Sequence, residues 1–268
     1  MTEVPPHLLD AMRERVWIYT ASVFAVAGKK PTYVGTATCV SVSGHASLLT
    51  AAHVWSALRG ERFALSLESE RLLVPIHKSI VDATVFDSKD SSEWGPDLAL
   101  LRLPELVARD IGQVKAFYNL DRRRPHSDDR AQYDKGVWAV IGAPAEQSTF
   151  GEKEGVLKIS LFASVIAKAQ ERDAFDYADL GFYHEDRPDL PASYGGISGS
   201  GLWHLPIQTS DSGTVSWNDE ARLEGVAFYQ KPTGNEEGVI RCHGRKSLYE
   251  QVAPASPNIG LQPSAAGS

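Results

Sequence analysis

The fold is decided by residues 16–54, which read VWIYTASVFAVAGKKPTYVGTATCVSVSGHASLLTAAHV. Three short runs in this stretch, 16–26, 32–42 and 45–54, have a strand-like composition, the first two being rich in β-branched and aromatic residues, and glycines punctuate the stretch. Such runs are typical of β-strands separated by turns. The stretch therefore predicts consecutive strands rather than helices.

Further runs of the same kind continue along the chain, and a polar, charge-dense segment at 119–136 divides them into two groups. Helix is expected only near the two ends, at 6–15 and 245–253. A parallel α/β fold would need long helices between the strands, and none is expected. The pattern predicts an all-β protein of paired antiparallel barrels or sandwiches. The other strand-like runs lie at 62–69, 71–77, 99–104, 137–144, 155–169, 201–208, 221–230 and 238–244.

The composition is that of a globular protein with a substantial core. Of the 268 residues, 43% are hydrophobic and 23% charged, and the net charge of −7 argues against nucleic acid as a partner. Two cysteines, Cys39 and Cys242, cannot form a disulfide framework. The N-terminal sequence does not read as a secretory signal, and no apolar stretch approaches the length of a membrane span. We expect a soluble, cytoplasmic protein with no membrane association.

Three short segments carry residues that can act together chemically. LLTAAHV (48–54) contains His53, GPDLALLRLP (95–104) contains Asp97, and YGGISGSGLW (194–203) contains Ser198. A serine hydroxyl needs an adjacent imidazole to take its proton, and that imidazole needs a carboxylate to fix its tautomer. A tetrahedral oxyanion needs backbone N–H donors, which the glycine-rich turn can supply from Gly196 and Ser198. The three segments together predict an acyl-transfer site.

The segments TAAHV (50–54), DLALLRL (97–103) and the G-x-S-G turn at 196–199 resemble those of the chymotrypsin/trypsin-like serine peptidases. The likeness is to the bacterial trypsin-like peptidase-domain proteins in particular, and VIGAPA (140–145) and LEGVAFYQ (223–230) extend it. The resemblance implies two six-stranded antiparallel β-barrels, with short terminal helices and the active site between the barrels. It also implies five parts of the chain: an N-terminal helical segment (1–15), an N-terminal β-barrel (16–118), a polar inter-barrel connection (119–136), a C-terminal β-barrel with a closing helix (137–253) and a flexible tail (254–268).

The resemblance also implies a role for each site residue in a serine endopeptidase that uses no metal or organic cofactor. Ser198 would be the nucleophile, His53 the general base, and Asp97 the group that orients the imidazole. The N–H groups of Gly196 and Ser198 would form the oxyanion hole. The remaining predicted contacts are the base of the specificity pocket at Ala192 and backbone hydrogen bonds to an extended protein or peptide substrate from Phe228, Tyr229 and Gln230.

The sequence departs from the family at several positions. Ile197 replaces the aspartate that, in the secreted members, pairs with a newly cleaved N-terminus, so we expect no need for N-terminal trimming. Ser200 and Gly201 replace the glycine and proline that often follow the serine turn. Ala192 carries no charge and predicts a preference for small or apolar side chains, which Asp186 or Asp189 would overturn if either reached the pocket.

Other interpretations remain open. The GISGS run resembles the nucleophile elbow of lipases and esterases, but no long helix is expected after Ser198. Cys242 beside His243 could form a thiol site, although neighbours on a strand point to opposite faces. Asp82 and Asp134 are other candidates for the role of Asp97. No histidine or cysteine spacing indicates a metal site.

Two questions concern the biological use of this fold. The first is whether the protein is a catalytically silent member that serves as a protein-binding module. The second is restraint, since a protease in the cytoplasm must be controlled. Similar stand-alone bacterial proteins resemble members of stress or defence gene sets in which a partner supplies the switch. We therefore hypothesise latent activity that a regulatory protein partner releases.

Overall fold

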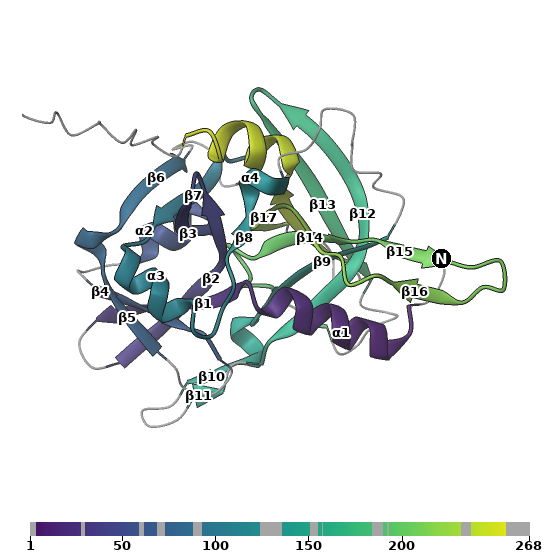
Figure 1. Ribbon diagram of the computed structural model, residues 1–268, viewed down its shortest axis with the longest axis horizontal. Helices are drawn as coiled ribbons and strands as arrows, with labels where there is room; N and C mark the ends of the chain where they lie inside the picture. Colours follow the sequence, from purple (N-terminus) through teal and green to yellow (C-terminus); the bar gives the residue numbers. More distant parts are fainter. Residues whose placement is uncertain are drawn as a thin grey trace, which may run out of the picture.

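The computed structural model describes residues 4–27, 30–58, 62–68, 73–87, 93–123, 136–150, 155–156, 158–183, 190–191, 193–231 and 237–255. The chain is built mainly of β-strands, which form two large sheets side by side, one from each half of the sequence (Figure 1). Of the predicted segments, most of the polar connection (124–135) and most of the C-terminal tail (256–268) lie outside the described residues.

The first half forms a sheet of eight strands. Seven follow the order β5-β4-β1-β2-β3-β7-β6, and β8 pairs in parallel with β2. The two outermost strands, β5 and β6, are joined only by residues 78–81, so the sheet must curve until its ends approach each other. The expected six-stranded barrel is thus met here by a curved, open sheet. Its strands are β1 (Thr20–Ala27), β2 (Lys30–Val42), β3 (His45–Thr50), β4 (Arg62–Ser66), β5 (Leu73–His77), β6 (Asp82–Asp87), β7 (Asp97–Arg102) and β8 (Tyr118–Asn119).

The second half forms a closed barrel of six antiparallel strands in the order β12-β13-β18-β17-β14-β9. This confirms the predicted architecture for this half of the chain. The barrel strands are β9 (Val137–Gly142), β12 (Ser160–Arg172), β13 (Phe175–Tyr183), β14 (Gly201–Leu205), β17 (Arg222–Lys231) and β18 (Glu237–His243). Two small two-stranded pairs accompany it: β10 (Thr149–Phe150) with β11 (Gly155–Val156), and β15 (Ile207–Thr209) with β16 (Val215–Trp217).

Helices occur at both ends of the chain, as predicted, and also inside it, where none was expected. α1 (Pro6–Trp17) lies near the start, and a π-helix, η3 (Ser247–Val252), closes the second half. Three internal helices are α2 (Ala52–Ala57), α3 (Glu105–Ile111) and α4 (Leu120–Arg123), with 3-10 turns η1 (Lys78–Ile80) and η2 (Ala145–Gln147). These helices have seven residues or fewer, too short for apolar periodicity to indicate them. Within the predicted polar connection, Leu120 is fully buried.

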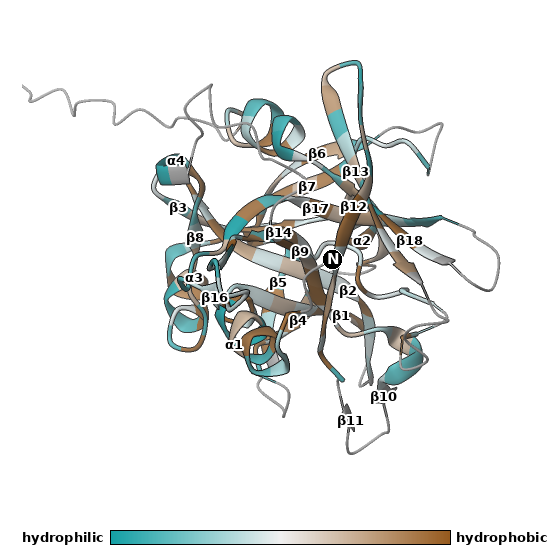
Figure 2. Ribbon diagram, turned by 90° about the vertical axis from the view of Figure 1, so that its right-hand side faces the viewer, coloured by the Kyte–Doolittle hydropathy of each residue, from teal (hydrophilic) through white to brown (hydrophobic). Residues whose placement is uncertain are grey.

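Hydrophobic residues concentrate on the strands near the centre of the molecule, whereas the outer helices α1 and α3 carry both hydrophilic and hydrophobic residues (Figure 2). One core cluster joins the halves, with Leu49 and Leu98 from the first sheet and Ile141 and Trp203 from the barrel. Separate clusters fill the first sheet and the barrel interior. The two halves therefore share a hydrophobic interface. No helix in the described ranges is long and apolar enough to cross a membrane.

Candidate active site

Strand register brings His53 and Asp97 together. β3 and β7 pair antiparallel with Thr50 opposite Ala99, so the residues that follow β3 meet the start of β7. The chain leaves β3 extended at Ala51 and turns at once into α2, whose second residue is His53. Asp97 is the first residue of β7. A regular ladder thus places the two side chains at one end of the sheet.

The Asp97 carboxylate contacts His53 at two points. Its Oδ2 lies 2.6 Å from His53 Nδ1, and its Oδ1 accepts a hydrogen bond from the His53 backbone N–H at 2.9 Å. Because an ionised carboxylate only accepts, the proton of the neutral imidazole lies on Nδ1, and Nε2 carries the lone pair. The Asp97 side chain is 13% exposed and that of His53 is 49% exposed. A largely buried carboxylate therefore orients an imidazole that remains accessible.

Ser198 lies in the turn that precedes β14. Its carbonyl accepts a hydrogen bond from the Thr36 N–H at 2.9 Å, which ties this turn to β2 of the first sheet. A Cβ on the adjacent Gly35 would lie 2.7 Å from a methyl group of Val54 and 3.0 Å from the Ser198 carbonyl. β2 therefore runs in close contact with both the serine turn and the residue that follows His53.

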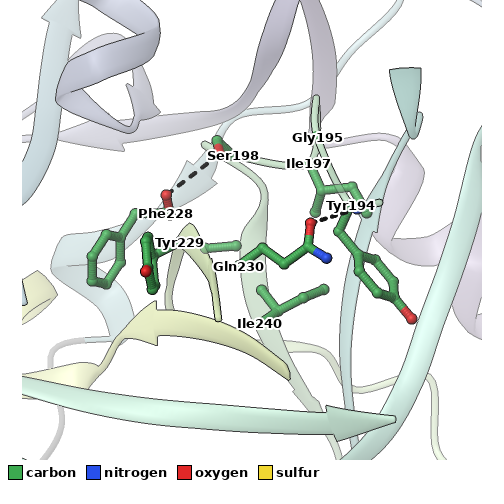
Figure 3. Close-up of a pocket in the computed structure, with 9 residues that line it drawn as sticks. Tyr194, Gly195, Ile197, Ser198, Phe228, Tyr229, Gln230 and Ile240 are labelled. Atoms are coloured by element: carbon green, nitrogen blue, oxygen red, sulfur yellow. Dashed lines mark hydrogen bonds between the residues drawn. The ribbon is translucent and has the colours of Figure 1, made fainter. Parts of the chain in front are cut away.

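The Ser198 hydroxyl points to the carbonyl of Phe228. Its Oγ donates to Phe228 O at 3.4 Å, a long hydrogen bond (Figure 3). Among the described residues, Ser198 makes no hydrogen bond with His53. A change of χ1 at Ser198 redirects this hydroxyl without any movement of the backbone. Of the two hydrogen bonds expected of the three residues, the one between histidine and aspartate is formed and the one between serine and histidine is not.

Residues 193–200, which we name the serine turn, contain two N–H groups that donate to no described residue. All eight residues are described, and six of their N–H groups donate hydrogen bonds to described partners. The exceptions are Gly196 and Ser198, for which no described residue serves as acceptor. These are the two N–H groups that the sequence predicts for an oxyanion hole.

Neighbouring carbonyl groups fix the direction of these two N–H groups. The Gly195 carbonyl accepts a hydrogen bond from Ala145 N–H at 2.7 Å, and the Ile197 carbonyl accepts one from Ser200 N–H at 2.9 Å. The C=O and N–H of one trans peptide point in opposite directions. The Gly196 N–H therefore points away from Ala145, and the Ser198 N–H points away from the Ser200 N–H.

Two glycines allow this conformation. Gly196 and Gly199 have φ angles of +93° and +90°. A Cβ at Gly196 would lie 2.5 Å from the Tyr33 ring, and one at Gly199 would overlap the Thr36 carbonyl. The Gly196 carbonyl accepts hydrogen bonds from the hydroxyls of Tyr33 at 2.6 Å and Thr36 at 2.8 Å. Burial raises the pKa of Tyr33 to about 12, so its hydroxyl stays protonated.

Ile197 anchors the serine turn by packing into the barrel. It is 1% exposed and belongs with Tyr194 to the core cluster inside the barrel. The Tyr194 N–H donates to Gln230 Oε1 at 2.9 Å, and the Ser193 N–H donates to the Glu146 carboxylate at 3.0 Å. Burial of Ile197 and hydrogen bonds to the side chains of Gln230 and Glu146 thus hold the serine turn in place.

A small pocket of about 60 Å³ opens beside Ser198. The Gln230 side chain extends across it toward Tyr194, and Ile240 lies beneath (Figure 3). These side chains leave a shallow, uncharged space among the described residues. Ala192, which we predicted at the base of the pocket, lies outside the described residues, as do Asp186 and Asp189.

Phe228, Tyr229 and Gln230 lie where β17 loses one of its neighbours. β14 pairs with β17 as far as Val226, whereas Tyr229 and Gln230 pair with β18 alone among the described strands. The carbonyl of Phe228 faces Ser198. Among the described residues, β14 therefore no longer flanks β17 beyond Val226, at a point close to the serine.

The alternative chemistries find little support in the geometry. Cys242 is fully buried in the barrel core, where burial raises the pKa of its thiol, and burial likewise raises that of Cys39 to about 12. Asp82 lies exposed on β6, and Asp134 lies outside the described residues. In the described part of the chain, no three His, Cys, Asp or Glu side chains gather as metal ligands. Ser198 is followed by strand β14 rather than by the helix of a nucleophile elbow.

Sequence reasoning missed several residues that shape the site. Tyr33 and Thr36 support Gly196, and the side chain of Gln230 closes the pocket. His243 accepts a hydrogen bond from the Asp97 N–H at 3.0 Å. No spacing signals these contacts, because each joins segments that only the folded chain brings together.

Comparison with known proteins adds little. No family model and no curated protein matches the chain. One solved structure, from work on aromatic interactions in the coupled folding and binding of the intrinsically disordered Sesbania mosaic virus VPg protein, is 16% identical in sequence. The match covers 87% of this chain and 89% of that one, with a TM-score of 0.47. The interpretation of the site therefore depends on its own geometry.

Proposed function

We propose that the protein is a trypsin-like serine endopeptidase that hydrolyses peptide bonds through an acyl-enzyme on Ser198. One observation carries the proposal: the serine turn holds two N–H donors, at Gly196 and Ser198, that no described residue accepts from, in a site that also contains a carboxylate-oriented imidazole. An oxyanion hole and a prepared general base are the groups that acyl transfer needs most. The same proposal treats the curved sheet of the first half as the counterpart of the N-terminal barrel that the resemblance implies.

The proposed reaction begins with rotation of the Ser198 hydroxyl away from Phe228 O toward His53 Nε2. His53 takes the hydroxyl proton as Oγ attacks the substrate carbonyl, and Asp97 stabilises the resulting imidazolium. The N–H groups of Gly196 and Ser198 bind the oxyanion. His53 then gives the proton to the leaving amine, which departs as the acyl-enzyme forms. Water deprotonated by His53 attacks the ester, and Ser198 recovers its proton on release of the acid.

The serine turn supports activity without N-terminal trimming. Its peptide groups are held by hydrogen bonds within the chain, and Ile197 is buried where the secreted relatives use a charged anchor. We therefore expect the oxyanion hole to be formed in the isolated chain. In the proposed cytoplasmic stress or defence role, a regulatory partner would control either the orientation of the Ser198 hydroxyl or access to the pocket beside it.

The pocket supports a preference for small side chains at the residue whose carbonyl is attacked. Gln230 and Ile240 fill much of the space beside Ser198 and leave about 60 Å³. The end of the β14–β17 pairing at Val226, close to Ser198, supports binding of an extended peptide along β17 by strand addition, through the backbone of Phe228, Tyr229 and Gln230.

Reaction with a fluorophosphonate probe tests the proposal. We expect intact-mass spectrometry to show one adduct on the wild type and none on Ser198→Ala, with His53→Ala labelled far more slowly. An unlabelled wild-type protein with native circular dichroism would favour the other candidate, a silent fold that serves as a protein-binding module. This second function is favoured by one observation: the Ser198 hydroxyl donates to the Phe228 carbonyl and not to His53.

A further inference from the structure

Strand β18 of the barrel lies against the loop that carries Asp97 in the first half. His243 Nε2 accepts a hydrogen bond from the Asp97 N–H at 3.0 Å. Two residues earlier, Arg241 donates to the Glu93 carbonyl at 3.1 Å. Residues two apart on a strand share a face, so one face of β18 contacts both ends of the segment 93–97.

Arg241 is itself rigidly held. It is 1% exposed, its Nε and Nη2 donate to the two carboxylate oxygens of Asp179 at 2.8 and 3.3 Å, and its guanidinium lies 3.9 Å from the centre of the Trp94 ring. A bidentate pair of this kind fixes direction as well as distance. The strand that carries His243 is therefore a firm support.

His243 is enclosed on all sides that the structure describes. It is fully buried, stacks on Phe228 with ring centres 4.4 Å apart, and contacts Tyr177 at 5.1 Å. Gly95 leaves room for it, because a Cβ there would lie 3.0 Å from His243 Nε2. These contacts hold the imidazole with Nε2 directed at the Asp97 N–H.

The proton of His243 lies on the opposite nitrogen. Since Nε2 accepts from the Asp97 N–H, Nδ1 carries the hydrogen, and no described residue accepts it. Burial lowers the pKa of His243 to about 3, against a smaller opposing effect of Asp97, so the ring is neutral at neutral pH. A neutral ring adds no charge that would compete with His53 for the Asp97 carboxylate.

We propose that His243 is a positioning residue, which fixes the backbone of Asp97 so that its carboxylate can contact both the N–H and the Nδ1 of His53. This inference rests on the proposed function, because it assigns a part in the same site. The contact joins the two halves: the carboxylate comes from the first sheet, and the group that holds its backbone comes from the barrel. Small displacements at a catalytic group have large effects on rate, so the contact matters for catalysis.

Three substitutions test the inference. His243→Phe keeps a buried ring but removes the acceptor. His243→Gln places an amide oxygen near the position of Nε2. The side chain of His243→Asn is one methylene shorter, so its amide oxygen does not reach the Asp97 N–H. The matched control is His204→Phe, because His204 is also buried and stacks on an aromatic ring, Trp138, with ring centres 4.6 Å apart.

Two readouts separate positioning from mere stability. The first is the fluorophosphonate reaction, resolved into a maximal rate and a binding constant. The second is the downfield proton resonance of His53 Nδ1, assigned by its loss in His53→Ala and observable whether or not the protein hydrolyses anything. We expect His243→Phe and His243→Asn to lose about 100-fold in maximal rate with unchanged probe binding, and to lose or shift the resonance. His243→Gln and His204→Phe should remain close to wild type in both.

Equal rates and an unchanged resonance in His243→Asn and His243→Gln would overturn the inference and leave the proposed function intact. If His243→Phe does not fold, the comparison of Gln with Asn decides the matter alone. A wild type that never reacts with the probe would instead contradict the proposed function, while the resonance would still show whether His243 holds Asp97 in place.

Discussion

The two halves of the molecule build their parts of the site in different ways. In the first half, the pairing of β3 with β7 brings His53 and Asp97 together through a regular ladder, and the functional groups are side chains. In the second half, the serine turn has no regular structure, and the groups that matter most are two backbone N–H donors. The first arrangement follows from strand register, whereas the second needs a separate hydrogen bond for nearly every peptide group.

The difference also appears in the state of each part. The histidine–aspartate contact is formed at 2.6 Å, and the peptide groups of the serine turn are fixed, but the Ser198 hydroxyl donates to Phe228. The backbone and the buried carboxylate are thus arranged in advance, and one side-chain rotation remains. Preorganised dipoles of this kind supply the largest share of catalysis in many enzymes.

The largest expected effect comes from removing the reacting side chains of either half. We expect Ser198→Ala and His53→Ala each to lower turnover of a peptide substrate by about 10⁴ or more. The double variant should be little worse than either single one, because the residues act as a unit. Steady-state kinetics measures this, with unfolding curves as the control. Additive losses in the double variant would mean that the two halves do not work together.

A smaller effect is expected from the backbone of the serine turn. Gly196→Ala should lower turnover by about 10²–10³, because the added methyl group meets the Tyr33 ring and displaces one oxyanion donor. Gly213 is a matched control, since it has a φ of +80° and a Cβ added there would have no described atom within 4 Å. Gly213→Ala should carry the cost of positive φ alone and keep full activity per folded molecule. Equal activities of the two variants would remove the oxyanion hole from the mechanism.

The contact between the halves predicts how stability depends on pH. The folded-state pKa of His243 is about 3, whereas an unfolded histidine titrates near 6.5. Between these pH values His243 is protonated in the unfolded chain but neutral in the folded chain. The free energy of unfolding therefore falls as the pH drops below about 6.5. From pH 6.5 to pH 5 the loss from this group is roughly 2 kcal/mol. Urea unfolding of wild type and His243→Gln measures it, and identical pH profiles would contradict the buried neutral ring.

The pocket predicts the smallest effect. Ile240→Val removes one methylene from its lining, and we expect the preference for a larger over a smaller side chain to rise about tenfold. Ile141→Val, in the core cluster between the halves, is the control for loss of a buried methylene, at about 1 kcal/mol of stability. Competition between paired peptide substrates measures the ratio. A similar ratio in both variants would show that the pocket does not select the substrate.

The parts that sequence could predict are those carried by local pattern. The β-rich runs indicated strands, which the structure contains, whereas the six-stranded barrel was implied by the family resemblance and not by the runs. The segments around His53, Asp97 and Ser198 indicated a three-residue site, of which the histidine–aspartate contact is formed. The six-residue helix that bears His53 could not be predicted, because its apolar residues Ala52 and Val54 continue the pattern of the preceding strand. The open form of the first sheet depends on pairing between distant strands, which no single run encodes.

The supporting contacts could not be predicted for a related reason. Tyr33 and Gly196 are 163 residues apart, and Asp97 and His243 are 146 apart, so neither pair has a local signature. For Gln230 the sequence predicted a backbone contact with substrate, whereas the structure shows that its side chain lines the pocket and accepts a hydrogen bond from the Tyr194 N–H. Long-range tertiary contacts decide these details.

The proposed peptidase activity is tested most directly by cleavage of a mixed peptide library with purified protein, with new chain ends mapped by mass spectrometry against Ser198→Ala. We expect new termini after small side chains, present with the wild type and absent with the variant. Identical peptide maps for the two proteins, under conditions where both are folded, would contradict it.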